Sequence, residues 1–304
     1  MDGRNSATSV LEENEEWPNR FLVEYRVMRM LISAAAFALM ASVSMTGAAM
    51  AQVSGHIQKC QDDDATISDL IVHCTAAIKS GNMTPQQEAR AFLNRGVAFF
   101  DREQYTLALR DYGLAEARDP RIPTTYANRA NTHVRMGNPT LAVQDYDRAL
   151  SLQPNDVQSL IGKGGALIQL SRYSEAAQAY TQAVRLDAED PNAWFNLGIA
   201  HTRLNDHAAA VRDFGRVIAL APEDAEAYVS RSRAQQAQGD VNAAYRDLTR
   251  AIEIDPAYSF AYYRRGRILQ EGGREAQARS DLSKAYQLGL DDPWLAEYVA
   301  TLGQ

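Results

Sequence analysis

A 34-residue period dominates this chain and restricts what it can fold into. Six consecutive units occupy residues 89–122, 123–156, 157–190, 191–224, 225–258 and 259–292, without insertion or deletion. Position 20 of every unit is alanine, and position 8 is always small. Positions 4 and 24 hold large apolar or aromatic residues, as at Trp194 and Phe214 of unit four. A fixed period of this length predicts a stack of similar helical units rather than a fold around one central core.

Each unit is predicted to be a helix, a tight turn and a second helix. Two antiparallel helices approach closely only where the facing side chains are small, and positions 8, 20 and 27 provide such side chains. The residues near position 15 suit the left-handed conformation that ends a helix, at Gly137, Asn205, Gly239 and Gly273. Proline at position 32 stops the second helix in four units, at Pro120, Pro154, Pro222 and Pro256.

These columns resemble the tetratricopeptide repeat family, whose pattern runs from an aromatic residue through Leu-Gly, Tyr, Ala, Phe, Ala and Pro. Unit four fits this pattern best, with Trp194, Leu197, Gly198, Ala210, Phe214 and Pro222. Five units depart from it at position 7, where leucine is usual, with Arg95, Arg129, Lys163, Arg231 and Arg265. The resemblance implies an all-α fold: an α-solenoid of six helix-turn-helix repeats over residues 85–292. Residues 52–84 would cap one end, and a helix in 293–304 would cap the other.

The resemblance also implies that the first helices line a concave groove, which holds a peptide or a helix of a partner protein. The side chains expected to face that groove include Asn131, Arg135, Ile161, Phe195, Ile199, Arg203, Arg233, Tyr263 and Arg267. The groove floor would be apolar in the middle and flanked by arginines, which suits a segment with apolar side chains and some acids. The alternative is that these arginines are simply a solvated face of the scaffold.

A charge pattern runs through the scaffold as well. Position 23 is aspartate in five units, at Asp111, Asp145, Asp213, Asp247 and Asp281. Together with the cations at position 7, these residues predict an arginine–aspartate ladder between helices, which fixes register more than it adds stability. A charged recognition stripe is the alternative interpretation. His133 and His201 at position 11 are expected to be core or boundary residues, since other units hold Phe99, Leu167 and Leu269 there.

Residues 28–51 have the anatomy of a secretory signal peptide. The apolar run at 31–43 follows Arg29, and Ala49-Met50-Ala51 offers a cleavage site before Gln52. Residues 1–27 are acidic, so we expect either a mis-assigned extension, with translation starting at Met28 or Met30 instead of Met1, or a disordered arm. The rival interpretation is an uncleaved inner-membrane anchor over residues 31–51. The leading expectation is a periplasmic or secreted protein of a Gram-negative bacterium, without stable membrane insertion.

Cys60 and Cys74 are the two cysteines of the chain. In an oxidising compartment we expect them to pair, and closing a loop of this size contributes roughly 3 kcal/mol in the chain-entropy model. Two buried free thiols are the alternative. Residues 65–79 are predicted to form a helix that ends at Gly81, and the bond would pin the strand before Cys60 to this helix. A metal site is not expected, because His73 beside Cys74 lacks further ligands.

Charge and motif content restrict the function. The net charge of −7 disfavours a nucleic-acid partner held by phosphate contacts. The sequence contains no recognisable catalytic, metal or cofactor motif, so we expect no enzyme activity and no cofactor. The predicted function is a periplasmic scaffold or adaptor that binds a protein or peptide partner. Two alternatives are a structural component of an envelope assembly, acting through its convex face or ends, and a regulatory subunit of an envelope enzyme. Stacking of ends would also permit self-association.

Overall fold

The computed structural model describes residues 47–62 and 64–302, and within them all regular elements are helices. The described residues from Val53 onward form one compact unit. The predicted arm at 1–27 and the apolar run at 31–43 lie outside the described residues. Among the helices that the structure does describe, none is both long and apolar enough to cross a membrane.

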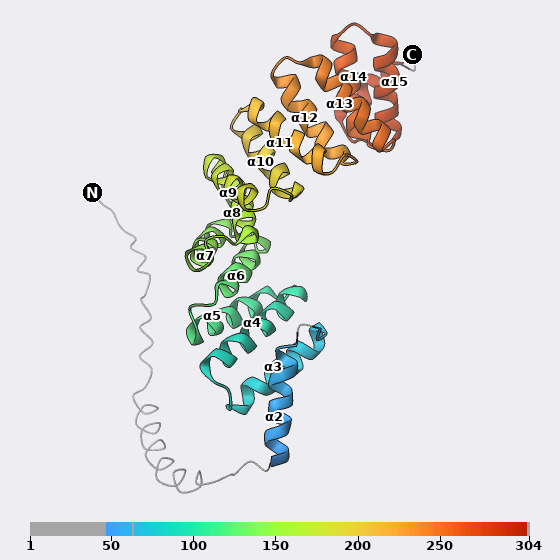
Figure 1. The fold of residues 1–304 in the computed structure, drawn as a ribbon. Coiled ribbons are helices and arrows are strands. Elements are labelled where there is room, and N and C mark those ends of the chain that lie inside the picture. Colours follow the sequence, from blue (N-terminus) through green and yellow to red (C-terminus); the bar gives the residue numbers. More distant parts are fainter. Residues whose placement is uncertain (1–46, 63, 303–304) are drawn as a thin grey trace, which may run out of the picture. The chain divides into compact units, whose positions relative to one another are not determined.

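Six antiparallel helix pairs follow one another along the chain, one pair for each predicted unit (Figure 1). The first helices are α4 (Pro85–Asp101), α6 (Pro123–Arg135), α8 (Val157–Gln169), α10 (Pro191–Arg203), α12 (Ala225–Ala237) and α14 (Ser259–Glu271). The second helices are α5 (Tyr105–Arg118), α7 (Pro139–Leu152), α9 (Tyr173–Leu186), α11 (His207–Leu220), α13 (Val241–Ile254) and α15 (Glu275–Gln287). Each helix packs on the one before it and the one after it. The predicted α-solenoid of six units is confirmed.

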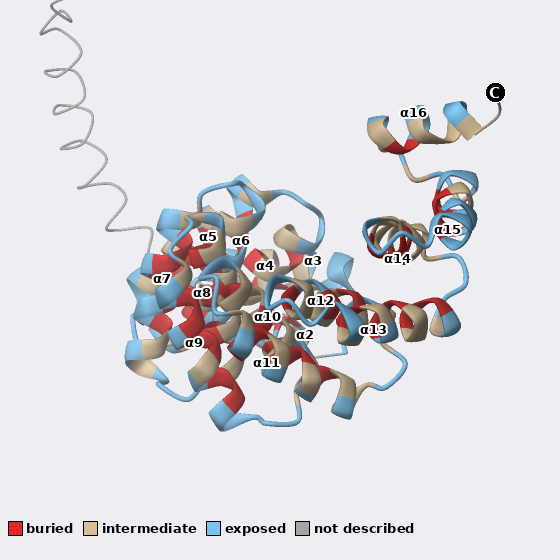
Figure 2. Ribbon diagram, turned by 90° about the horizontal axis from the view of Figure 1, so that it is seen from above, coloured by how far each residue is buried: buried red, intermediate tan, exposed pale blue. Residues whose placement is uncertain are grey.

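The small and large columns of the repeat form the core, as predicted. All six alanines at position 20 have an exposed fraction of 0%. Where position 8 is glycine, the large side chain at position 24 lies directly against it: a Cβ atom added to Gly164 would lie 2.5 Å from the Tyr180 ring. Figure 2 shows buried residues along the faces where neighbouring helices meet. The helices of a pair are therefore close because glycine leaves room for a ring.

The turn inside each unit has one residue with positive φ at position 15. The predicted glycines and Asn205 adopt this conformation, and so do two residues that were not predicted to, Glu103 and Ser171, each with φ of 58°. Side chains with a Cβ atom disfavour this region. The turn geometry is imposed by the two packed helices, and it overrides the local preference at Glu103 and Ser171.

The amino-terminal cap differs from the prediction in one respect. The segment before Cys60 is not a strand but a helix, α2 (Gly47–Cys60), and α3 (Ile67–Ser80) follows it. Residues 47–60 contain no proline and no run of β-branched residues, and a helix satisfies their backbone hydrogen bonds internally. The predicted cleavage site before Gln52 lies within α2, so that cleavage there would remove its first five residues.

The predicted disulfide between Cys60 and Cys74 is present, and both cysteines are buried. It joins the end of α2 to the middle of α3. The Asn94 side-chain amide in α4 donates a 2.8 Å hydrogen bond to the carbonyl oxygen of Cys60. On the same two helices, the Nδ1 atoms of His56 and His73 lie 2.8 Å apart, so one ring donates a hydrogen bond and the other accepts it. These contacts brace the open end of the first repeat.

The carboxyl-terminal cap is α16 (Pro293–Leu302). Leu295 has an exposed fraction of 0% and packs against Leu282 and Ala285 of α15. Trp294 and Tyr298 lie at the edge of the same cluster, with their rings stacked at 5.3 Å. The helix thus covers the apolar side of the last repeat, which solenoids must shield from water.

Candidate functional site

The first helices of repeats one to four touch one another along the stack. Contacts join α4 to α6, α6 to α8 and α8 to α10, in addition to the contacts within each pair. Second helices make no contacts of comparable extent with one another within residues 64–302. Repeats one to four therefore approach more closely along their first helices. We call the surface formed by α4, α6, α8, α10, α12 and α14 the first-helix face.

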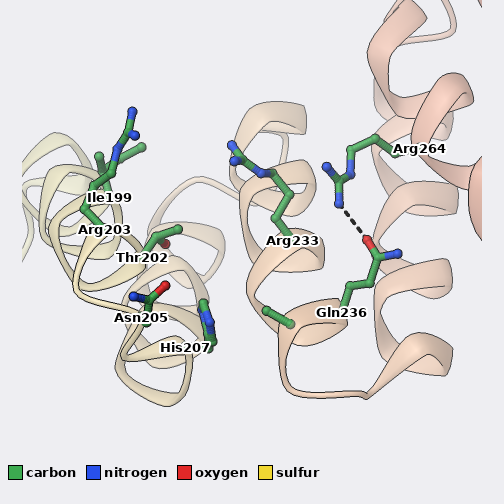
Figure 3. A pocket seen from close by; sticks show the side chains of 9 residues that line it. Ile199, Thr202, Arg203, Asn205, His207, Arg233, Gln236 and Arg264 are labelled. Atoms are coloured by element: carbon green, nitrogen blue, oxygen red, sulfur yellow. Dashed lines mark hydrogen bonds between the residues drawn. The ribbon is translucent and has the colours of Figure 1, made fainter. Parts of the chain in front are cut away.

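An open pocket of about 620 Å³ lies on the first-helix face where repeats four, five and six meet (Figure 3). Helices α10, α12 and α14 each contribute side chains to it, together with the turn before α11 and the first residue of α11. The lining residues are Ile199, Thr202, Arg203, Asn205, His207, Arg233, Gln236, Ala237 and Arg264. The pocket thus combines three guanidinium groups, several uncharged polar groups and two small apolar patches.

Three of the nine predicted groove residues line this pocket: Ile199, Arg203 and Arg233. Arg203 and Arg233 are exposed, and Ile199 is half-buried. Figure 3 shows the three arginine side chains of the pocket coming from three different helices.

The other six predicted residues lie elsewhere along the stack. Asn131 is exposed and accepts a hydrogen bond from the Tyr146 hydroxyl. Exposed Arg135 interacts with Tyr105, which raises the pKa of the arginine. Ile161 packs on the core of repeats two to four, and the Phe195 ring packs on Phe214 with centroids 5.4 Å apart. The remaining two residues, Tyr263 and Arg267, lie against the carboxyl-terminal cap.

The capping helix occupies the end of the first-helix face. The Trp294 ring lies edge-on to Tyr263 with centroids 6.1 Å apart, and the Arg267 guanidinium sits 4.3 Å from the centre of the Trp294 ring. A cation over a tryptophan face is a favourable arrangement. Tyr263 and Arg267 therefore contact α16. They differ in this respect from the pocket residues Arg203 and Arg233, which are exposed to solvent.

Sequence reasoning missed Arg264, which is the most buried arginine of the pocket. It occupies position 6 of repeat six, a position that was not expected to face the groove. Its Nη2 atom donates a 2.6 Å hydrogen bond to the side-chain oxygen of Gln236 in α12. Burial lowers the pKa of Arg264, and the positive charge of Arg233 lowers it further, with smaller opposing contributions from Tyr263 and Glu271. The available signal was the pair Arg264–Arg265, because repeat six has one aspartate at position 23, Asp281, and Arg265 binds it.

The predicted arginine–aspartate ladder is present in four repeats. Arg95–Asp111, Arg129–Asp145, Arg231–Asp247 and Arg265–Asp281 each form two parallel hydrogen bonds of 2.6–2.9 Å. The aspartates are buried, and the arginines lie between the two helices of one unit. These arginines are paired with aspartates inside their own repeats, so they do not belong to the pocket.

Repeats three and four break the ladder in different ways. Repeat three has Ala179 at position 23, and Lys163 instead pairs with Asp147 of the preceding repeat at 2.6 Å. Repeat four has Leu197 at position 7, and the His201 Nδ1 atom lies 2.5 Å from the Asp213 carboxylate. Burial raises the pKa of Asp213, and the hydrogen bond with His201 opposes that effect. His201 is thus a partner of the ladder aspartate rather than only a packing residue.

The comparisons with known proteins identify the repeat. The tetratricopeptide repeat family model matches residues 128–191, 166–227 and 195–259. The repeats that it matches are tetratricopeptide repeats. A sequence search of curated proteins gives no match.

Solved structures with tetratricopeptide repeats have the same fold. YrrB, described as a TPR protein with an unusual peptide-binding site, is 23% identical over 62% of this chain and 97% of its own, with a TM-score of 0.54. A tetratricopeptide repeat protein from Parabacteroides merdae is 21% identical over 81% of this chain and 96% of its own, with a TM-score of 0.57. MamA is 24% identical over 52% of this chain and 93% of its own, with a TM-score of 0.51. At these identities the likeness concerns the fold alone.

Proposed function

We propose that this protein is a binding scaffold that holds a peptide or a helix of a partner protein on its first-helix face. The observation that carries this proposal is the pocket of about 620 Å³ between α10, α12 and α14. Because three consecutive repeats line it, a ligand there contacts all three units at once and depends on their stacking. YrrB, with a similar fold, is described as having a peptide-binding site, which supports the proposal by analogy.

The chemistry of the pocket favours a peptide over a compact apolar ligand. Guanidinium and amide groups lie beside Ile199 and Ala237, and the pocket is open to solvent. Extended peptides and exposed helices present alternating polar and apolar groups, which such a surface can match. The capping helix α16 covers the last repeat, so the free surface lies on the side of the stack rather than at this end.

Site-specific photocrosslinking in the cells that produce the protein tests the proposal. A photoreactive residue at Ala237 in α12 reports on the first-helix face, and one at Asn242 in α13 reports on the second helices of the same repeat. Both positions are exposed, so neither substitution disturbs the core. We expect a partner adduct from position 237 and none from position 242. Adducts from position 242 alone would replace the proposal with a role for the convex face.

The same experiment separates the remaining alternatives. Adducts between two copies of this chain would identify a self-assembling structural component. A partner that is an envelope enzyme, bound at position 237 and altered in activity, would make the scaffold a regulatory subunit. The mass of the crosslinked product identifies the partner in both cases, and an assay of the partner enzyme with and without the scaffold measures the change in its activity.

We propose further that the scaffold acts after export to the periplasm. The support is the signal-peptide pattern at 28–51 together with a buried disulfide between Cys60 and Cys74, a bond that persists in oxidising compartments. Amino-terminal sequencing of the protein from fractionated Gram-negative cells is the test. A chain that begins at Gln52 in the periplasmic fraction is expected. A chain in the membrane fraction that retains residues 31–51 would point to an anchored form instead.

A further inference from the structure

Two kinds of arginine occur on the first helices, and they differ in whether a carboxylate neutralises them. The ladder arginines, such as Arg231, each hold an aspartate of the same repeat through two hydrogen bonds. The pocket arginines Arg203, Arg233 and Arg264 have no carboxylate at ion-pair distance in the part of the chain that the structure describes. The chain is acidic overall, with a net charge of −7, so carboxylates are not scarce. The positive charge of the pocket is therefore a local feature.

Without a ligand, the surroundings of Arg264 destabilise the folded protein. Its Nε atom is buried without a hydrogen-bond partner among the described residues, while Nη2 donates to Gln236. Arg233 of the preceding repeat faces it with the same charge, and this repulsion adds to the burial that lowers the pKa of Arg264. Figure 3 shows the Arg264 side chain extending toward α12. An anion placed between Arg233 and Arg264 would neutralise both charges.

We propose that this pocket is a subsite for an acidic segment of the partner, in which two carboxylates engage Arg203, Arg233 and Arg264 while a neighbouring apolar side chain lies on Ile199. Guanidinium groups bind carboxylates through paired, charge-assisted hydrogen bonds, and three guanidinium groups spread over three repeats exceed what one carboxylate uses. The open shape admits a continuous chain rather than an enclosed small anion. This inference rests on the proposed function, because it names the chemistry of the ligand that the first-helix face would hold.

Peptide binding measured by fluorescence anisotropy tests the inference. The probe is a labelled six-residue peptide of alternating glutamate and leucine, amidated at its carboxyl end so that only side-chain carboxylates are offered. The comparison probe has glutamine in place of glutamate, and inorganic phosphate serves as a competitor. We expect the glutamate peptide to bind about tenfold or more tightly than the glutamine peptide, because each buried charge-assisted hydrogen bond lost costs about this factor. The affinity should also fall as salt is raised.

Variants locate the effect in the pocket. Arg233→Gln and Arg264→Gln should each weaken binding of the glutamate peptide about tenfold and leave the glutamine peptide unchanged. Arg246→Gln is the matched control: Arg246 lies on α13 of the same repeat, is exposed and has no ion pair among the described residues, so its loss should change nothing. Circular dichroism of each variant checks that the repeats are intact. Because Arg233 is exposed, Arg233→Gln keeps the test decisive even where Arg264→Gln unfolds.

Three outcomes would overturn the inference. They are equal affinity for the two peptides, an equal loss with Arg246→Gln, and displacement of the glutamate peptide by inorganic phosphate at concentrations at which free glutamate, added as a second competitor, does not displace it. The proposed function fails separately. If the partner is still crosslinked at position 237 in an Arg233→Gln, Arg264→Gln double variant, the first-helix face still binds the partner. The binding then does not depend on the proposed acidic-segment subsite. If position 237 gives no adduct even in the wild-type chain, the scaffold proposal itself falls.

Discussion

The Phe214 ring lies so close to Gly198 that a Cβ atom on this glycine would be 2.8 Å from the ring. Gly198→Ala should therefore destabilise repeat four. Units two and five hold Ala130 and Ser232 at the same position, so part of the overlap can be relieved, and we expect a loss of about 1 kcal/mol. Gly198→Val should cost roughly 3 kcal/mol. Urea unfolding followed by circular dichroism measures both values.

A second glycine provides the control for this prediction. Gly113 lies in α5, and a Cβ atom there meets nothing within 4 Å. Gly113→Ala should stabilise the protein by about 0.5–1 kcal/mol, since alanine favours the helix and fills no occupied space. If Gly198→Ala stabilises the protein to the same extent, close packing at position 8 is not what sets the helix spacing.

Breaking one ladder pair should cost more than removing both of its members. Asp247→Ala leaves the Arg231 guanidinium, whose side chain is 23% exposed, without its carboxylate. We expect a loss of about 2 kcal/mol, below the value for a fully buried charge because the arginine still reaches water. In the double variant Arg231→Leu, Asp247→Ala most of this loss should be recovered. Repeat four already has Leu197 at position 7, and repeat three has Ala179 at position 23.

The double variant also decides whether the ladder recognises a ligand. A structural ladder predicts unchanged binding of the glutamate peptide when Arg231 is leucine. Stability is measured by thermal unfolding and binding by anisotropy on the same samples. A double variant less stable than Asp247→Ala would show that the ion pair is itself a source of stability.

Removing the disulfide should loosen the amino-terminal cap and leave the repeats folded. Replacing Cys60 and Cys74 by serine takes away a loop constraint worth about 3 kcal/mol in the chain-entropy model. Because helices contact mainly their neighbours, the loss should be confined to α2, α3 and the start of α4. Hydrogen exchange should become faster in residues 53–80 and stay unchanged in residues 157–254. The reduced wild-type chain should match the variant, and uniform acceleration throughout would contradict a local role.

His133 should make the protein less stable in mild acid. Burial lowers the pKa of His133 below its ordinary value of 6.5; the charge of Asp145 opposes this effect and that of Arg129 adds to it. Its Nδ1 atom is buried without a partner among the described residues, and Nε2 is 3.8 Å from Asp145. The unfolded chain therefore binds a proton at a higher pH than the folded chain does. Stability falls as the pH drops through 6.5 and levels off below the lowered pKa.

The variant His133→Leu isolates this effect. Repeats three and six hold Leu167 and Leu269 at the same position, so leucine fits the column. The urea midpoint of the wild-type chain should decline more between pH 7.5 and pH 5 than that of the variant. At pH 7.5, where the histidine is neutral in both states, the variant should be at least as stable. Identical declines in the two proteins would assign the acid sensitivity to other groups.

The repeat could be predicted from sequence because its physics is local. The pattern consists of glycine opposite a ring, alanine between helices and proline after a helix, and all of these act within 34 residues. Six units repeat this pattern, which makes the prediction more reliable. Arg231 and Asp247 are 16 residues apart in one unit, so their pairing also followed from the spacing. The helical state of residues 47–60 was missed because that segment lies outside the period and has no repeat to support it.

The pocket could be predicted only in part. Arg203 and Arg233 follow from positions that face a groove in the family, whereas Arg264 does not. Its side chain reaches the pocket because repeat six stacks on repeat five in such a way that Arg264 meets Gln236, 28 residues earlier. This depends on the rotation between two units, which the column pattern of one unit does not contain. Lys163 shows the same limit, since it pairs with Asp147 of the preceding repeat.

Contacts that run mainly between consecutive helices also determine how the protein responds to a mechanical load. Tension applied to the two ends is carried by the interfaces in series, so the weakest interface gives way while the others hold. Each repeat of 34 residues then releases roughly 115 Å of chain, and the protein lengthens in steps. The loop closed by Cys60 and Cys74 is held back while the bond is intact, which shortens the fully stretched chain by about 45 Å. A repeat stack of this kind lengthens gradually, and the redox state of its surroundings sets its maximum length.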